Sequence, residues 1–366
     1  MFQTSSRICS ATVPLFAAMA LLPCSAQAQV ADFSWYGRLD LSLESNSNGA
    51  LNRTAIQNFS SRLGIRGERS FNSQLQGIFQ VETGIAPDDT TQSKSLASRN
   101  SFVGIKSGQL GTLLVGTHDM PLKTLEGTAN ALWGEGDLQE LIIHGKASRV
   151  AIGSSVIDNV HTRKTNVLLY TSPKMNHWVF KLAYSPDEAK VAASGSIPSY
   201  DKDMVGASLE FDNGMFNVGL ATQSQNNFIA PTSTTGGSSM KGTKFTTGIK
   251  WGQWTGGVAT STLNNGRGKK VSNSLITTTY QFDSIVLKAS MGSSGESSSG
   301  ANDSVSATAF EVDYKLDKST TFYSYFAQIK NAANAKGTFA AADNFPAVVT
   351  AGNDPRAFGL GIRYNF

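Results

Sequence analysis

Apolar residues alternate with polar residues along most of the chain that follows residue 29. The segment 306–316 is typical, because Phe310 and Val312 alternate there with Glu311 and Asp313. Successive side chains of a β-strand point to opposite faces, so this period of two predicts a strand with one apolar and one polar face. Helical spacing of apolar residues is scarce, and the chain is therefore predicted to be almost entirely β.

Sixteen segments show this alternation, with about nine to twelve residues each, the length that a tilted strand needs to cross a bilayer. We predict strands at residues 33–45, 60–70, 73–85, 99–107, 111–118, 165–173, 177–186, 202–212, 215–225, 243–252, 254–263, 273–282, 284–293, 306–316, 320–330 and 356–366. Tight turns alternate with long polar connections, as expected for short periplasmic turns and long external loops. The long connections lie at 46–59, 86–98, 226–242, 264–272, 294–305 and 331–355, and the longest runs from about 118 to 164.

No segment after residue 29 approaches the run of about 18 apolar residues expected of a membrane-spanning helix. Lipid cannot satisfy an open sheet edge, so strands that cross a membrane must close into a barrel. A barrel of 16 to 18 strands leaves an aqueous channel, whereas eight strands are filled by their own side chains. The predicted fold is therefore all-β, a 16-stranded antiparallel transmembrane β-barrel. The formal net charge of +4 is too mild to predict nucleic-acid binding.

The start of the chain has the features of a secretory signal peptide, predicted at residues 1–28. Arg7 supplies a positive charge, residues 13–22 are apolar, and Ala26-Gln27-Ala28 fits a cleavage site. The apolar stretch is short for an uncleaved membrane anchor, and Pro23 disfavours lipidation of Cys24. Both cysteines lie in this segment, so the predicted mature chain, residues 29–366, has no thiol nucleophile and no disulfide.

Charges in phase along the strands identify the face that lines the lumen. Arg38, Arg62 and Arg66 share the polar faces of the first two strands. A charge on the lipid face near the midplane costs about 2–4 kcal/mol, so these side chains are predicted to point inward. They are either simple solvated lumen charges or part of a charged ring that tunes the choice of ions. Aromatic residues near strand ends fit interfacial girdles, namely Trp35, Trp178, Trp251, Trp254, Tyr364 and Phe366.

Several short motifs, taken in order, resemble the general porin family of Gram-negative bacteria, in its β-proteobacterial form. They are Tyr36-Gly37-Arg38-Leu39-Asp40, Ser61-Arg62-Leu63-Gly64-Ile65-Arg66-Gly67, Ile78-Phe79-Gln80-Val81-Glu82-Thr83-Gly84, Arg99-Asn100-Ser101-Phe102-Val103-Gly104-Ile105, Leu110-Gly111-Thr112, Tyr170-Thr171-Ser172-Pro173 and Gly361-Ile362-Arg363-Tyr364-Asn365-Phe366. Each motif alone is weak, but their order and spacing are specific. The resemblance spans the whole mature chain.

The resemblance implies an outer-membrane homotrimer whose long third loop, about residues 118–164, folds into each pore. It implies that loop acids face wall arginines across a constriction, and Arg62 and Arg99 match those arginines by position. Candidate loop residues are Lys123, Glu126, Glu135 and Asp137. The loop acids are alternatively ordinary surface residues.

Two positions depart from the family pattern. Thr117 and Leu169 stand where an arginine is common, which puts the strength of any anion preference in doubt. Arg163 and Lys164 are candidates to compensate.

The resemblance also implies partners: the lipid bilayer, lipopolysaccharide, small hydrophilic solutes, and the barrel-assembly machinery that recognises a terminal Phe366. It implies passive diffusion with a mild anion preference and no cofactor. A substrate-specific channel for small organic anions is the alternative. An enzyme is disfavoured, because neither a G-x-S-x-G elbow in a strand–helix context nor an H-E-x-x-H motif occurs.

Overall fold

The computed structural model describes residues 32–89, 91, 94–145, 160–186, 190–266, 268–339 and 350–366. The predicted signal peptide, residues 1–28, lies outside them. Within the described residues the strands are β1 (Asp32–Ser47), β2 (Asn52–Asn58), β3 (Arg62–Ser70), β4 (Leu75–Gly84), β5 (Ser101–Ser107), β6 (Gly111–Asp119), β7 (Arg163–Thr171), β8 (Trp178–Ser185), β9 (Met204–Asp212), β10 (Phe216–Ile229), β11 (Ser238–Trp251), β12 (Trp254–Asn264), β13 (Lys270–Phe282), β14 (Ile285–Ser294), β15 (Val305–Lys315), β16 (Thr320–Asn331) and β17 (Arg356–Asn365).

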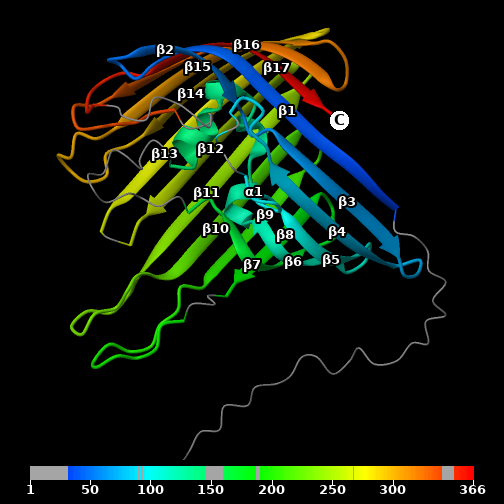
Figure 1. The fold of residues 1–366 in the computed structure, drawn as a ribbon, viewed down its shortest axis with the longest axis vertical. Helices are drawn as coiled ribbons and strands as arrows, with labels where there is room; N and C mark the ends of the chain where they lie inside the picture. Colours follow the sequence, from blue (N-terminus) through cyan, green and yellow to red (C-terminus); the bar gives the residue numbers. More distant parts are fainter. Residues whose placement is uncertain are drawn as a thin grey trace, which may run out of the picture.

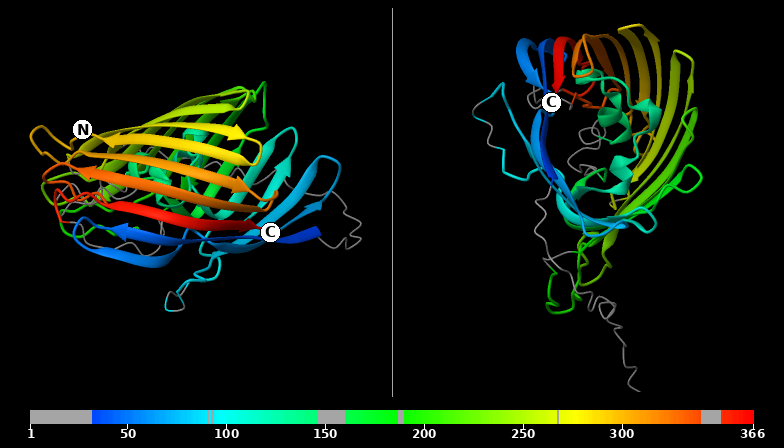
Figure 2. Two further views of the ribbon diagram at one scale, coloured as in Figure 1. Left: turned by 90° about the horizontal axis from the view of Figure 1, so that it is seen from above. Right: turned by 90° about the vertical axis from the view of Figure 1, so that its right-hand side faces the viewer.

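These strands form one closed antiparallel sheet. From β3 to β17 each strand pairs with the next along the chain, and β17 pairs back with β1, for example through Asp40 and Arg363. Figures 1 and 2 show the sheet curving round on itself, with β1 beside β17. The predicted closed, all-β barrel is confirmed.

β2 and β3 are two halves of one wall strand. Both pair with β1, β3 through residues 32–38 of β1 and β2 through residues 41–47. Two residues of β1, Leu39 and Asp40, therefore face three residues, 59–61, which form a β-bulge. Counted this way, sixteen strands complete the wall. The prediction that 46–59 is an external loop is wrong for β2, because the strand continues past the bulge.

The other predicted strands match the structure closely, except at the ends of two of them. β10 runs on to Ile229 and β11 begins at Ser238, so the connection predicted at 226–242 is shorter. The two strands extend because they still pair beyond the predicted ends: Gln225 pairs with Met240 and, after a shift in register, Ile229 pairs with Ser238. Short turns such as 252–253 and 283–284 lie at one end of the barrel and longer connections at the other.

The two faces of the wall have opposite character. Leu287, Phe310 and Val312 are exposed on the outer face. Their neighbours Lys288 and Glu311 point inward and are buried. The predicted alternation of apolar and polar residues is thus confirmed: apolar side chains form the lipid-facing row of most strands, and polar side chains form the inward-facing row. Within the described residues, no helix is long and apolar enough to cross a membrane.

The connection after β6 lies inside the ring of strands (Figure 2, right). Residues 120–145 of this connection are called the loop segment below. It contains α1 (Pro121–Thr124), η1 (Gly127–Ala129), η2 (Gly134–Gly136) and η3 (Gln139–Ile143). Residues 146–159 of the predicted third loop lie outside the described residues.

Apolar residues hold the loop segment against the inward face of the wall. Leu122, Leu125, Leu138, Ile142 and Ile143 are almost completely buried, and they join one core cluster with inward-facing residues of the wall. Small wall residues leave the space for this packing: they include Ala221, Ala259, Ala307, Ala309 and Ala327. The position of the loop segment therefore depends on side-chain volume as well as on charge.

Candidate functional site

A cavity of about 520 Å³ lies between the loop segment and the wall. Its lining side chains come from both. They are Arg38, Phe59, Ser60, Arg62, Arg99, Asp119, Lys123, Glu126, Asn130, Leu132, Trp133, Gly134, Asp137, Glu140, Arg163 and Arg363. Six of these side chains are cationic and four are acidic, which leaves a formal excess of two positive charges along this part of the lumen.

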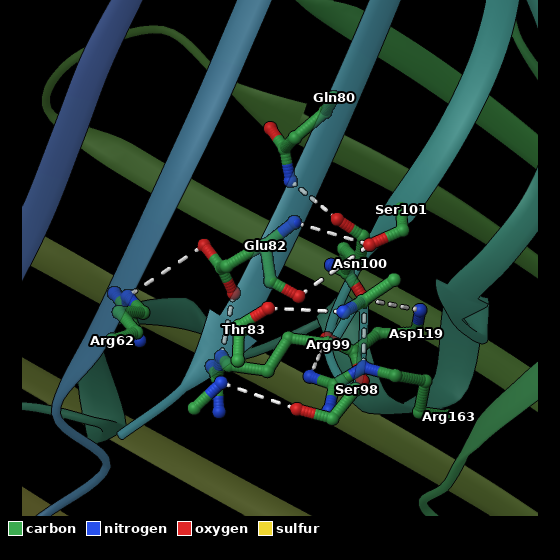
Figure 3. Close-up of polar contacts among 12 residues, drawn as sticks. Arg62, Gln80, Glu82, Thr83, Ser98, Arg99, Asn100, Ser101, Asp119 and Arg163 are labelled. Atoms are coloured by element: carbon green, nitrogen blue, oxygen red, sulfur yellow. Dashed lines mark hydrogen bonds and ion pairs between the residues drawn. The ribbon is translucent and has the colours of Figure 1, made fainter. Parts of the chain in front are cut away.

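Two lining arginines share one buried carboxylate (Figure 3). Arg99 Nε donates to Glu82 Oε1 at 2.5 Å, and Arg62 Nε lies 3.8 Å from Glu82 Oε2. The Tyr36 hydroxyl donates to Glu82 Oε2 at 2.9 Å. Strand alternation places Tyr36, Arg62 and Glu82 on the inward faces of β1, β3 and β4, so a single negative charge positions two cations and neutralises only part of their charge.

A second shared carboxylate lies where the loop segment leaves β6. Asp119 accepts a hydrogen bond from Arg163 Nη2 at 3.0 Å and lies 3.2 Å from Lys123 Nζ. Arg163 Nε also donates to Asn100 Oδ1 at 2.8 Å, which in turn accepts from the backbone N–H of Asp119 (Figure 3). These contacts tie the start of the loop segment to β7 and again leave more positive than negative charge.

Trp133 anchors the middle of the loop segment. Two cations lie over its ring, Arg363 at 3.7 Å and Lys288 at 4.0 Å from the ring centroid, and Tyr323 packs edge-on at 5.7 Å. Its backbone N–H donates to Glu311 Oε2 at 2.6 Å. Cation–π contacts of this kind strengthen when water is excluded, so the Trp133 cage fixes the loop segment firmly.

Local backbone geometry brings the loop segment this close to the wall. Gly134 has a φ of 59°, and a Cβ at this position would collide with the ring of Tyr325. Only glycine adopts this conformation without strain and also leaves the space that the ring fills. The Tyr325 hydroxyl donates to Glu44.

The two ends of the wall meet at the same place. Arg363 of β17 bonds Asp40 of β1 through both Nε, at 2.7 Å, and Nη2, at 2.5 Å. Tyr323 donates to the other oxygen of Asp40 at 2.7 Å. Arg38 Nε donates to Asn365 Oδ1 at 3.0 Å. The seam between β1 and β17 is therefore closed by inward-facing side chains as well as by backbone pairing.

A buried histidine cluster, formed by His144, His161, Glu140 and Lys244, holds the end of the loop segment. His144 stacks on His161 with 4.4 Å between ring centroids. Lys244 Nζ lies 3.3 Å from His144 Nε2, and Glu140 Oε1 lies 3.3 Å from His144 Nδ1. Burial lowers the pKa of His144 to about 4 and the pKa of His161 well below its usual range. A neutral His144 can accept from Lys244, whereas a protonated one would face an ammonium.

The structure brings most of the residues singled out from the sequence into one place. Six line the cavity: Arg38, Arg62, Arg99, Lys123, Glu126 and Asp137. Arg66 and Glu135 are outside its lining. Arg66 is exposed beside the ring of Tyr36, 5.0 Å from its centroid, and Glu135 is buried in η2.

Sequence reasoning missed Trp133 and Arg363 as lining residues. Alternation along the last strand does place Arg363 inward, but nothing in the sequence shows that Trp133 would meet it. Thr117 and Leu169, at the positions where the family often has arginine, are not among the lining residues. Leu169 is instead buried in an apolar cluster with Leu114 and Met120.

Comparison with known proteins identifies the family. The model of the Gram-negative porin family matches residues 15–334 of the chain. The chain is a Gram-negative porin. Family and fold together place this porin in the outer membrane.

Two curated relatives match part of the porin. The major outer membrane protein P.IB of Neisseria gonorrhoeae is 28% identical over 142 residues, which is 36% of this chain and 39% of the relative. The P.IB protein of Neisseria lactamica is 26% identical over 179 residues, 46% of this chain and 48% of the relative. The porin thus matches less than half of the length of these relatives.

Solved porin structures share the fold over nearly the whole chain. The anion-selective porin from Comamonas acidovorans has a TM-score of 0.70 at 18% identity, covering 92% of this chain and 100% of that one. The trimer form of OmpT from Vibrio cholerae has a TM-score of 0.63 at 16% identity, with coverage of 92% and 100%. The OmpF of Salmonella typhi has a TM-score of 0.61 at 16% identity, with coverage of 91% and 97%.

Proposed function

We propose that this porin forms a water-filled channel through which small hydrophilic solutes and ions diffuse passively across the outer membrane, with a mild preference for anions. The observation that carries the proposal is the cavity between the loop segment and the wall, with its excess of cationic lining. A fixed cation in a lumen lowers the barrier for an anion and raises it for a cation.

The loop segment narrows the lumen in this proposal and sets the size limit. Packing by Leu138 and Ile142, together with the Trp133 cage, supports a fixed constriction rather than a mobile flap. Glu126 and Asp137 on the loop segment face the same space as Arg62 and Arg99 on the wall. This opposition would produce a transverse field across the constriction.

The preference is expected to be mild because acidic lining offsets much of the cationic charge. The absent arginines at positions 117 and 169 reduce it further, and Arg163, which lines the cavity, offsets part of that loss. The solved neighbour from Comamonas acidovorans is described as anion-selective, and this supports the same sign of selectivity here.

The porin is proposed to act as a homotrimer, in keeping with the trimer form of its OmpT neighbour. Its remaining proposed partners are the bilayer, lipopolysaccharide and the barrel-assembly machinery, the last through Phe366. No catalytic role is proposed, since its family is one of channels rather than of enzymes.

Single-channel recording in a planar bilayer with a salt gradient tests this function. We expect a large ohmic conductance that appears in groups of three equal steps, one step for each pore of a trimer. The sign of the reversal potential should show that anions permeate more readily than cations. A reversal potential of the opposite sign would reject the anion preference, and correctly folded protein without conductance would reject the open channel. Saturable block of the current by a small organic anion such as acetate or succinate would favour a substrate-specific channel.

A further inference from the structure

The short turn between β9 and β10 carries an Asn-Gly pair, Asn213-Gly214, in contact with water. Both residues are exposed. Gly214 has a φ of 91°, and no neighbouring atom lies within 4 Å of the position that a Cβ would occupy there. No packed neighbour therefore fixes the backbone of Gly214 against the side chain of Asn213.

An Asn-Gly pair can react with itself. The backbone N of the glycine attacks the side-chain carbonyl carbon of the asparagine, and a cyclic succinimide forms as ammonia leaves. Glycine permits this attack because it has no side chain to obstruct the close approach of its backbone. The reaction also needs a group that takes the proton from the attacking nitrogen and donors that polarise the carbonyl.

Three hydrogen bonds in the turn supply these groups. Gly214 N–H donates to Asp212 Oδ1 at 2.7 Å, so a carboxylate lies in position to take the proton from the attacking nitrogen. Asn213 Oδ1 accepts from the backbone N–H groups of Met215 at 3.0 Å and Phe216 at 2.8 Å. Two donors on one carbonyl oxygen polarise the carbon under attack and stabilise negative charge on that oxygen, as an oxyanion hole does.

The two other Asn-Gly pairs of the chain do not combine these features. Asn48 also accepts from two backbone N–H groups, at 3.0 and 2.8 Å, but its side chain is buried. Its glycine, Gly49, donates to the Ser47 hydroxyl at 3.2 Å rather than to a carboxylate. Asn265 is also buried, and Gly266 N–H donates to a side-chain amide oxygen at 2.9 Å. Both of these glycines have packed neighbours, unlike the glycine of the β9–β10 turn.

We propose that Asn213 is a self-modification site, at which the porin converts its own asparagine to aspartate and isoaspartate. The backbone N of Gly214 forms a bond to Asn213 Cγ and loses its proton to Asp212. The Cγ–Nδ2 bond breaks, and Nδ2 takes up that proton and leaves as ammonia. Water then opens the succinimide at either of its two carbonyl groups, which gives aspartate or isoaspartate without any oxidant or other co-reactant.

The modification changes the end of the β9–β10 hairpin. A neutral amide becomes a carboxylate beside Asp212, and two like charges so close repel each other. In isoaspartate the main chain runs through the former side chain, which lengthens the turn and removes the acceptor of Met215 and Phe216. Lys250 N–H of β11 donates to Met215 O at 2.8 Å, so the disturbance reaches the next strand. None of these residues lines the cavity, and the inference does not depend on the proposed function.

Timed incubation of the full mature porin in micelles, in a mildly alkaline buffer, tests the proposal. Peptide mass spectrometry with separation of aspartate and isoaspartate peptides measures the loss of amide at each Asn-Gly pair. A positioned base contributes about 10²–10⁴-fold in enzymes, and an exposed turn holds one less firmly, so Asn213 should react at least about tenfold faster than Asn48 and Asn265. In urea, where burial and the folded turn are lost, the three rates should converge.

A variant separates the role of the carboxylate from that of exposure. Asp212→Ser gives Gly214 the kind of acceptor that Ser47 provides in the buried pair, and it should slow the reaction at Asn213 about tenfold. Asp317→Ser is the matched control, because Asp317 accepts from backbone N–H groups in another exposed short turn and should leave the rate unchanged.

Three results would overturn the proposal. Equal rates at the three pairs in the folded porin would show that Asn213 is not a preferred site. An unchanged rate in Asp212→Ser would remove the carboxylate from the reaction. If Asn213 keeps the same lead in urea, the local sequence alone causes the preference and the folded turn has no part in it. The comparison within the wild type needs no variant, so it decides the question even if Asp212→Ser fails to fold.

Discussion

Replacing Glu82 with glutamine should make the channel more selective for anions. Glu82 accepts from Arg99 and Tyr36 and lies beside Arg62, and its single negative charge offsets part of two positive ones. Glutamine has nearly the same shape; its amide oxygen can still accept from Arg99, and its NH2 group can donate to the Tyr36 hydroxyl in place of the bond that Tyr36 donates to Glu82 Oε2. The substitution therefore removes charge with little change in geometry.

The size of the effect follows from the cavity. A volume of about 520 Å³ corresponds to a sphere of about 5 Å radius, and Glu82 lies behind the lining arginines, so its carboxylate is about 10 Å from an ion at the centre. One charge at that distance in water contributes about 0.4 kcal/mol, and the effects on anions and cations have opposite signs. After screening at 0.01 M salt, removing the charge changes the difference between the anion and cation barriers by about 0.6 kcal/mol. This corresponds to about a threefold change in the anion-to-cation permeability ratio.

Reversal potentials measured across salt gradients at several mean concentrations provide the assay. The anion-to-cation permeability ratio of Glu82→Gln should exceed that of the wild type about threefold near 0.01 M, and the two should converge near 1 M, where screening acts over about 3 Å. Glu68→Gln on the neighbouring strand is a matched control, because Glu68 is exposed and outside the cavity lining. An unchanged ratio at low salt, or a shift toward cations, would refute the reasoning.

Three other perturbations address separate parts of the site. Arg62→Gln removes a lining charge about 7 Å from the cavity centre and should lower the anion-to-cation ratio about fivefold at 0.01 M; an unchanged reversal potential would count against this role. Trp133→Ala should destabilise docking of the loop segment by about 3–5 kcal/mol. Current noise and proteolysis of the loop segment should therefore rise, while the thermal stability of the barrel stays the same. A quiet, protease-resistant channel would contradict the role of the Trp133 cage. Burial lowers the pKa of His144 to about 4, against about 6.5 in water. Docking of the loop segment should therefore be most stable above pH 6.5 and should lose stability as the pH falls toward 4. Brief closures should become more frequent over that range, and less so in His144→Gln; equal noise at pH 7 and pH 4.5 would exclude this coupling.

The fold follows from the sequence because the period of two is imposed on nearly every strand by lipid on one side and water on the other. β2 is the informative exception. Its residues, Asn52–Asn58, are mostly polar on both faces, so no alternation marks it. Its pairing is instead decided by the partner strand β1 and by the bulge at 59–61, neither of which a local pattern contains.

The candidate site is less accessible to sequence reasoning, because it joins side chains that no local pattern relates. Alternation and family resemblance select Arg38, Arg62 and Arg99 as inward-facing cations, and the structure places all three at one cavity. Arg66 shares their alternation but lies farther along β3, outside the lining. Alternation predicts which face of a strand a side chain occupies. The height of that side chain along the barrel axis depends instead on the tilt and register of many strands.

The Trp133 cage also sets the order in which this porin can be completed. Its members come from β14, β16 and β17, and Arg363 is itself held by Asp40 of β1, a residue 323 positions away along the chain. Contacts between such distant residues form late in folding, because the whole intervening chain must be arranged first. While β1 and β17 are unpaired, the contacts that hold Trp133 are incomplete. The loop segment of such a barrel stays accessible to periplasmic proteases. Burial of the Trp133 indole is therefore a sign that the barrel wall is complete. A barrel that is not yet closed is distinguished by a loop segment that proteases can cleave.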